Sequence, residues 1–276
     1  MAAALALAVV ALAGHGGSAP PYARVTEPRA VIWAVGDGAD GGDRARAVVG
    51  RISAGRVDRL LYLGDVYPSG TRSDFARNYA TTYGPLAAKT APTPGNHDWL
   101  NRSTGYRPYW RHALRHPIRD WYAFRAAGWT LLSLNSEAPH ERGSAQERWL
   151  RARVRAPGTC RIAFWHRPRF SAGLEHGDQP DMAALWNDLR GRAAIALAGH
   201  EHDMQRFRPI DGITEFVAGA GGKSHYAARA GENRLAFAND RDDGALRLTL
   251  RPGSAAYAFV AADGRVLDRG AIRCRR

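Results

Sequence analysis

Five apolar segments of the chain each end in an aspartate, an asparagine or a histidine. They lead to Asp37, Asp65, Asn96, His166 and the pair His200 and His202. Carboxylate, amide and imidazole groups are ligands for divalent or trivalent metals. Six such groups are too many for one ion with open positions, but they suit two ions sharing a bridging carboxylate, as in two-metal hydrolysis. Each residue alone is also explained as a turn residue or a hydrogen-bonded structural histidine, so the prediction of a metal centre rests on their joint occurrence.

Two of these motifs differ in how specifically they indicate a functional site. The stretch TPGNHDWL (93–100) places an amide, an imidazole and a carboxylate side by side, yet Asn, Gly, Asp and Pro also make ordinary turns. The stretch GHEH (199–202) is more specific. Two histidines at positions i and i+2 of an extended segment project to the same side, which favours a shared role.

The elements that would position these residues alternate between strands and helices. Strands are expected at 29–37, 57–65, 121–136 (two strands), 160–166 and 193–202; helices at 41–54, 73–86, 144–154 and 181–191; and short strands from 213 onward. This alternation is typical of a layered α/β domain. The carboxyl ends of central strands are where such folds build their sites.

In order and spacing, these motifs resemble the signature of the calcineurin-like metallophosphoesterases. The matching pieces are GDG (36–38), GD (64–65), GNHD (95–98), WH (165–166) and GHEH (199–202), within roughly residues 30–220. The resemblance implies an α/β fold, a four-layer α/β/β/α sandwich of two mixed β-sheets flanked by helices. We expect one such domain over residues 29–276, closed by the C-terminal strands.

The resemblance also implies a role for each matching residue. Asp65 would bridge two metal ions. The first ion would be held by Asp37 and His202, and the second by Asn96, His166 and His200. His97 would be the catalytic imidazole, and Asp98 would hold and polarise it, as a histidine acting as an acid requires.

The first metal site departs from the usual motif of this family. The family has Asp-x-His there, and the histidine position is Ala39 in this chain. Purple acid phosphatases depart in the same way and recruit a tyrosine after the second motif. Here Tyr67 follows Asp65 by two residues instead of three, and Pro68 restricts it to an extended conformation, so it should project to the side of Asp65. Alternatively, Tyr67 is a pocket wall, with Asp40 or water completing the site.

The expected reaction is hydrolysis of small phosphate monoesters by a metal-bound hydroxide, with iron, zinc or manganese as the two ions. His97 would stabilise the transition state or protonate the leaving oxygen. His176 and Arg167 are candidate substrate contacts; the alternatives are a solvent-exposed loop histidine and a surface arginine. The alternatives are a phosphodiesterase or nuclease, for which nucleic acid would be only a substrate, and an inactive binding protein that keeps the fold.

Composition adds an expectation about charge. The net charge is +13, and among 39 basic residues only Lys89 and Lys223 are lysines. The scattered arginines indicate a base-composition effect, with attraction to polyanions or phosphorylated substrates as the alternative.

The N-terminus predicts export. Residues 1–28 read as a signal peptide and linker, although an alanine-rich helix is the alternative. We expect a secreted or cell-envelope protein without stable membrane association. In an exported protein, the two cysteines, Cys160 and Cys274, would form a disulfide; otherwise they are separate thiols.

Overall fold

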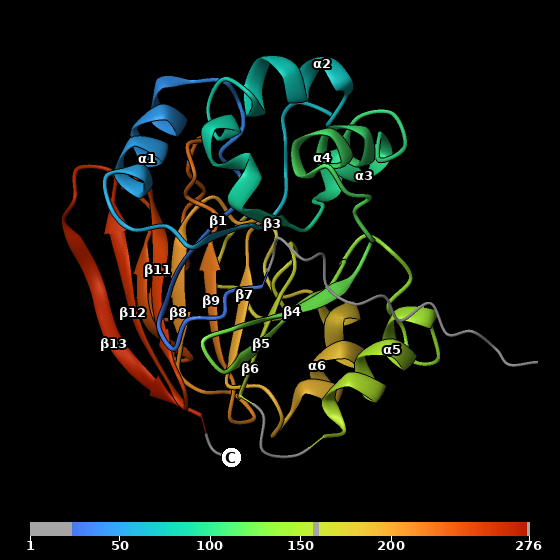
Figure 1. The fold of residues 1–276 in the computed structure, drawn as a ribbon. Coiled ribbons are helices and arrows are strands. Elements are labelled where there is room, and N and C mark those ends of the chain that lie inside the picture. The colour runs from blue at the N-terminus through green and yellow to red at the C-terminus, as the bar shows by residue number, and fades with distance from the viewer. Residues whose placement is uncertain (1–23, 157–159, 275–276) are drawn as a thin grey trace, which may run out of the picture.

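Two mixed β-sheets form the centre of the molecule, with helices outside them (Figure 1). The computed structural model describes residues 24–156 and 160–274. The predicted signal peptide lies almost entirely outside these residues. The layered arrangement confirms the predicted α/β sandwich of two mixed sheets flanked by helices.

The first sheet has six strands in the order β13-β12-β11-β1-β2-β3. These are β1 (Ala30–Val35), β2 (Arg59–Tyr62), β3 (Thr90–Pro92), β11 (Gly244–Arg251), β12 (Ser254–Ala261) and β13 (Val266–Arg273). β1, β2 and β3 run parallel, whereas β11 joins β1 in antiparallel register with Ile32 opposite Leu248. The C-terminal strands therefore complete a sheet that the N-terminal strands begin.

The second sheet has seven strands in the order β10-β8-β9-β7-β6-β5-β4. They are β4 (Tyr122–Ala126), β5 (Trp129–Ser133), β6 (Cys160–Phe164), β7 (Ile195–Ala198), β8 (Met204–Phe207), β9 (Thr214–Ala218) and β10 (Leu235–Asn239). β5, β6, β7 and β9 are parallel. The side chains of β6, β7 and β9 are buried throughout, as expected of strands covered on both faces.

Two hydrophobic clusters define the layers. The larger joins the inner faces of both sheets and includes Ile32, Leu60, Phe164 and Phe216. The smaller lies between the second sheet and two helices, α5 (Ala145–Val154) and α6 (Ala183–Leu189), with a short 3-10 turn at Pro180–Met182 before α6. These helices cover the outer face of the second sheet (Figure 1).

The remaining helices gather at the end of the sheets where the parallel strands finish (Figure 1). They are α1 (Asp43–Ser53), α2 (Arg72–Asp74), α3 (Asn96–Leu100) and α4 (Tyr106–Leu114). The single helix expected at 73–86 is wrong. The chain instead forms α2, a π-helical turn (Phe75–Tyr79) and a 3-10 helix (Gly84–Lys89), in which Pro85 occupies the first turn.

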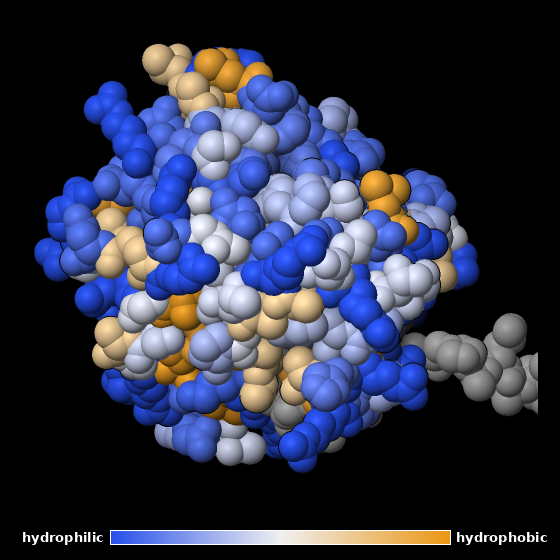
Figure 2. Space-filling view, turned by 90° about the horizontal axis from the view of Figure 1, so that it is seen from above, coloured by the Kyte–Doolittle hydropathy of each residue, from blue (hydrophilic) through white to orange (hydrophobic). Residues whose placement is uncertain are grey.

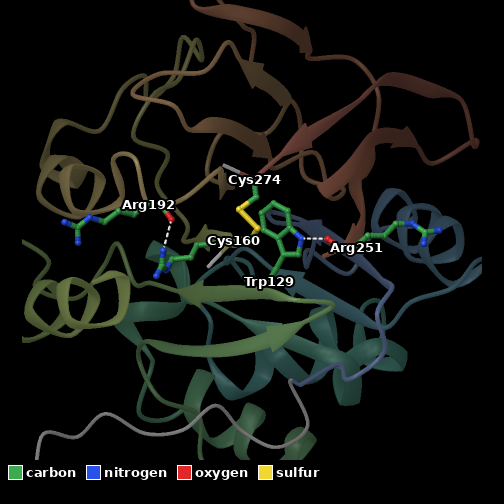
Figure 3. Close-up of a disulfide and its surroundings, with 6 residues drawn as sticks. Trp129, Cys160, Arg192, Arg251 and Cys274 are labelled. Carbon is green, nitrogen blue, oxygen red and sulfur yellow. Dashed lines mark hydrogen bonds between the residues drawn. A yellow bond between two sulfur atoms is a disulfide. The ribbon is translucent and has the colours of Figure 1, made fainter. Parts of the chain in front are cut away.

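A disulfide between Cys160 and Cys274 connects the two sheets (Figure 3). Cys160 begins β6 of the second sheet, and Cys274 directly follows β13 of the first; their Cα atoms are 5.5 Å apart. Beside them, the Trp129 indole donates a 2.8 Å hydrogen bond from the second sheet to the Arg251 carbonyl of the first. The predicted disulfide is therefore confirmed, and it fastens one sheet to the other.

The surface is mainly hydrophilic. Seen from above, over the helices that cover the strand ends, hydrophobic residues form only small separate patches (Figure 2). Within residues 24–156 and 160–274, no helix has the length and apolar character needed to cross a membrane.

Candidate metal centre

Three of the predicted ligands meet where the two sheets adjoin. Asp37 and Asp65 follow β1 and β2 of the first sheet, and His166 follows β6 of the second. One ligand atom from each lies within 4.8 Å of the others, and all three residues are buried. The strand ends therefore bring together side chains that are more than a hundred residues apart in sequence.

One half of the site surrounds His166. Its Nε2 lies 3.0 Å from Oδ1 of Asn96, 3.1 Å from Nδ1 of His200 and 3.5 Å from Oδ2 of Asp65. The other ring nitrogen, Nδ1, faces the Leu63 carbonyl at 2.8 Å. This carbonyl accepts a hydrogen bond only from a protonated Nδ1, so it leaves Nε2 free as a metal-binding atom.

The other half contains Asp37, Tyr67 and His202. The Tyr67 hydroxyl lies 3.1 Å from Oδ1 of Asp37 and 2.8 Å from Nε2 of His202. His202 Nδ1 faces the Ser224 carbonyl at 2.7 Å, so its Nε2 is likewise the atom presented to the site. Tyr67 thus points where the sequence predicted, despite the shorter spacing.

The alternative that Asp40 completes this half finds no support in its contacts. Its carboxylate accepts a 2.9 Å hydrogen bond from the backbone N–H of Gly42, the residue before α1. Asp40 therefore stabilises the start of a helix.

The backbone conformation at three of the predicted ligands explains how the short motif GHEH (199–202) reaches both halves of the site. Asp37, Asp65 and His200 have φ angles of 59°, 68° and 73°, in the left-handed region that non-glycine residues rarely adopt. The expectation that GHEH is extended and presents both histidines to the same side is therefore wrong. Because the chain turns at His200, its imidazole reaches the half around His166, whereas His202 reaches Asp37. Strained backbone of this kind is concentrated at functional sites.

Glycine is required where the loops of the site touch. A Cβ on Gly95 would lie 2.0 Å from Oδ1 of Asp65, which no side chain tolerates. The glycine before Asn96 therefore lets the third loop approach the central carboxylate closely.

The electrostatics of the site fit bound cations. Asp37 is fully buried and Asp65 is 2% exposed, and among the described residues their ion-pair partners are imidazoles alone. Burial, with a further contribution from the Asp65 charge, raises the pKa of Asp37 well above its ordinary value. Burial also lowers the pKa of His200, and that of His202 to about 4, so both imidazoles are neutral near pH 7. Neutral imidazoles and uncompensated carboxylates are the donor set that metal ions take.

His97 lies at the edge of this centre, but the partner predicted for it is wrong. Its Nε2 is 3.8 Å from Oδ2 of Asp65, and its Nδ1 contacts the Pro68 carbonyl. Asp98 instead accepts hydrogen bonds from the backbone N–H groups of Asp65, Val66 and Gly95, at 2.8, 3.0 and 2.9 Å. As the third residue of α3, Asp98 turns back to the start of its own helix and so fixes two site loops.

The two predicted substrate contacts lie beside His200. The His176 ring stacks on the His200 ring with centroids 4.0 Å apart. The Arg167 guanidinium bonds Oε1 of Glu137 at 2.9 Å and places Nη1 3.3 Å from His200 Nε2. Both residues therefore border the half around His166.

Three further residues that contact or adjoin the site were not predicted from the sequence: Tyr226, Lys223 and Glu201. Tyr226 stacks on His202 with centroids 3.9 Å apart, and the Lys223 ammonium lies 4.8 Å from the centre of the Tyr67 ring. Glu201, inside GHEH, accepts hydrogen bonds from the Ser171 hydroxyl and the Gly177 N–H. The one available signal was a rare lysine directly after a glycine-rich stretch.

The fold has relatives among solved structures. It superposes on purple acid phosphatase PPD1 from yellow lupin (TM-score 0.66, 17% identity), covering 94% of this chain and 54% of that one. A dimetal phosphatase from Danio rerio matches with a TM-score of 0.61 and 15% identity, covering 88% and 98%. GAP50, the anchor in the inner membrane complex of Plasmodium, matches with a TM-score of 0.72 and 13% identity, covering 90% of each chain.

Sequence comparison gives a more specific result. Purple acid phosphatase 21 of Arabidopsis thaliana is 29% identical over 164 residues, which cover 48% of this chain and 37% of that protein. The family model for the calcineurin-like phosphoesterases matches residues 30–204, a segment that contains all the ligand candidates above. By this match over more than half its length, the chain belongs to the calcineurin-like phosphoesterase family.

Proposed function

We propose that this protein hydrolyses phosphate monoesters at a centre of two metal ions. The observation that carries the proposal is the division of the donors into two groups. Asp37, Tyr67 and His202 form one, and Asn96, His166 and His200 the other. Asp65, whose carboxylate lies within 4.8 Å of donors from both groups, would bridge the two ions. Two adjacent ions sharing one carboxylate are the arrangement used for in-line displacement at phosphorus.

When bound, the metal ions would supply Lewis acidity and an activated water molecule. The chain's own residues supply the rest of the chemistry. The Pro68 carbonyl holds a proton on Nδ1 of His97, which leaves Nε2 to exchange a proton with a leaving oxygen. The side chain of His97 is 37% exposed, so it can reach a substrate that enters from solvent.

The relatives support a phosphatase. Two of the proteins with matching folds are named phosphatases, and the plant relative is a purple acid phosphatase. The tyrosine in the first group favours iron at that position, because a phenolate is a hard anionic donor that suits a trivalent ion.

The proposal extends to the setting of the reaction. The Cys160–Cys274 disulfide favours an oxidising compartment, in keeping with export through the N-terminal segment. The substrate would be a small phosphorylated molecule. Hydrolysis of diesters, including nucleic acid, is the second candidate, favoured by the net charge of +13.

The test is a substrate panel on protein loaded separately with manganese, zinc or iron. We expect para-nitrophenyl phosphate to be hydrolysed faster than its bis-ester and than single-stranded DNA, and metal-stripped protein to be inactive. Faster cleavage of the bis-ester or of DNA would replace the monoester proposal with the second candidate. Inactivity on all three substrates with every metal would contradict both, and would leave a binding protein that keeps the fold.

A further inference from the structure

Lys223 is held in a fixed position beside the first half of the site by a glycine-rich segment that follows β9. A Cβ on Gly219 would lie 1.9 Å from the Glu201 carbonyl oxygen, and one on Gly221 would lie 2.3 Å from that of Gly36. The segment therefore packs backbone against backbone with two site loops. At its end, the N–H of Lys223 donates a 3.0 Å hydrogen bond to the carbonyl of Asp37. Lys223 is thus tied directly to a ligand residue.

The side chain of Lys223 extends from this anchor over the phenol of Tyr67. Its Nζ lies 4.8 Å from the ring centre, and the His97 ring lies 4.7 Å from the same ring. The Tyr67 hydroxyl is the group that contacts Asp37 and His202. Lys223 and the predicted catalytic imidazole therefore both border the first half of the site.

The ammonium of Lys223 carries its charge close to Tyr67 and Asp37 of the site. In the described part of the chain, no Asp or Glu oxygen forms an ion pair with its ammonium. Arg167, at the other half of the site, differs because its guanidinium is paired with Glu137. Of the two cations at the border, Lys223 is therefore the one with a free charge to offer a ligand.

We infer that Lys223 is a specificity-determining residue that binds a non-esterified oxygen of the substrate and so selects phosphate monoesters over diesters. This inference rests on the proposed function. Above its second pKa, near 6, a monoester carries two negative charges and three free oxygens. A diester carries one charge and has a second ester group in place of one of those oxygens. An ammonium placed beyond the metal centre would bind that third oxygen in a monoester alone.

The chain provides a matched control for this charge. Lys89, the other lysine, is exposed at the end of the 3-10 helix Gly84–Lys89. Lys223→Met and Lys89→Met remove the same charge, at the site and away from it. Lys223→Arg keeps the charge with a different donor geometry, and it tests whether a loss of binding follows the charge or the local packing.

The first measurement is calorimetric binding of inorganic phosphate to metal-loaded protein at about pH 8, with metal content determined for each variant. We expect Lys223→Met to weaken phosphate binding about tenfold or more, as for loss of a charged hydrogen bond. Lys89→Met should bind as the unmodified protein does, and Lys223→Arg should retain most of the affinity. Unchanged binding in Lys223→Met at equal metal content would overturn the inference.

The second measurement separates this inference from the proposed function. The ratio of kcat/KM for para-nitrophenyl phosphate to that for its bis-ester should fall about tenfold in Lys223→Met, through the monoester value alone. An equal fall for both substrates, or none, would overturn the role of Lys223 while leaving the hydrolase intact. If the unmodified protein binds phosphate through Lys223 but hydrolyses neither ester, the proposed function fails and Lys223 remains a phosphate-binding residue.

Discussion

The hydroxyl of Tyr67 lies 2.8 Å from Nε2 of His202 and shares with it the carboxylate of Asp37. Ala39 occupies the position where the family usually has a ligand histidine, and a methyl group cannot bind a metal. The phenol therefore supplies an oxygen donor to the half of the site that has one imidazole fewer than the family usually provides.

Iron-loaded protein should accordingly show a visible phenolate-to-iron charge-transfer band, and Tyr67→Phe should abolish it. Absorption spectra of the two proteins at equal iron content measure this directly. A colourless iron-loaded protein, or the same band in the Tyr67→Phe variant, would show that Tyr67 is only a wall of the site.

Glu201 should act on the substrate through His176. Its Oε1 accepts hydrogen bonds of 3.0 Å from the Ser171 hydroxyl and 2.8 Å from the Gly177 N–H, at the two ends of the loop that carries His176. We expect Glu201→Ala to raise KM for a monoester several-fold with a smaller effect on kcat. Glu201→Gln, which keeps the accepting oxygen, should remain close to the unmodified enzyme.

A double-mutant cycle checks this coupling. Glu201→Ala should add little to the effect of His176→Ala. Glu201 would act only by positioning the His176 ring, and His176→Ala already removes that ring. Independent, additive effects on KM would show that Glu201 does not work through His176.

The disulfide should contribute strongly to stability because it joins the two sheets and spans 114 residues of sequence. The chain-entropy model gives about 4–5 kcal/mol for a loop of this length. Chemical denaturation of the Cys160→Ser/Cys274→Ser protein, compared with the unmodified protein with and without reductant, measures the difference. Equal midpoints in all samples, or two free thiols in protein made under oxidising conditions, would reject this role.

The metal-free protein should lose stability in acid through His202. Burial lowers the pKa of this residue from 6.5 to about 4, so between these pH values the unfolded chain binds more protons than the folded chain. The free energy of unfolding should therefore fall as the pH decreases through this window, by about 2–3 kcal/mol from this residue. His202→Asn should remove that part of the slope, whereas His112→Asn, at an exposed position, should not. The same slope in both variants would contradict the assignment.

The positions of most strands along the chain, and the residues that gather at their ends, could be predicted because both follow from local patterns. Apolar runs ending in Asp, Asn or His mark buried strands that finish at a common edge, and the disulfide followed from cysteine count and expected compartment. The interrupted helix at 72–89 could not be predicted in the same way, because tertiary packing of Phe75, Tyr79 and Tyr83 competes there with regular helix geometry.

The finer errors concern the direction of single side chains. The sequence around Asp98 indicates no partner for its carboxylate other than His97. In the fold, three backbone N–H groups from two loops donate hydrogen bonds to that carboxylate instead. His200 adopts a left-handed backbone conformation, which is rare for a non-glycine residue and is not predicted by the residue type. Lys223 comes from a segment far from every ligand motif, and only the close packing of its glycines against Gly36 and Glu201 brings it to the site.

The proposed function depends most directly on Asp65 as the bridge between two metal ions. The decisive measurement is metal content together with para-nitrophenyl phosphate turnover in Asp65→Asn. Asp43→Asn serves as the control, because that carboxylate is fully exposed on α1. We predict two metal ions per chain in the unmodified and control proteins. In a folded Asp65→Asn protein, we predict at most one ion and a fall in turnover of about a hundredfold or more. Two ions with full turnover in Asp65→Asn, or full turnover in metal-stripped unmodified protein, would contradict it.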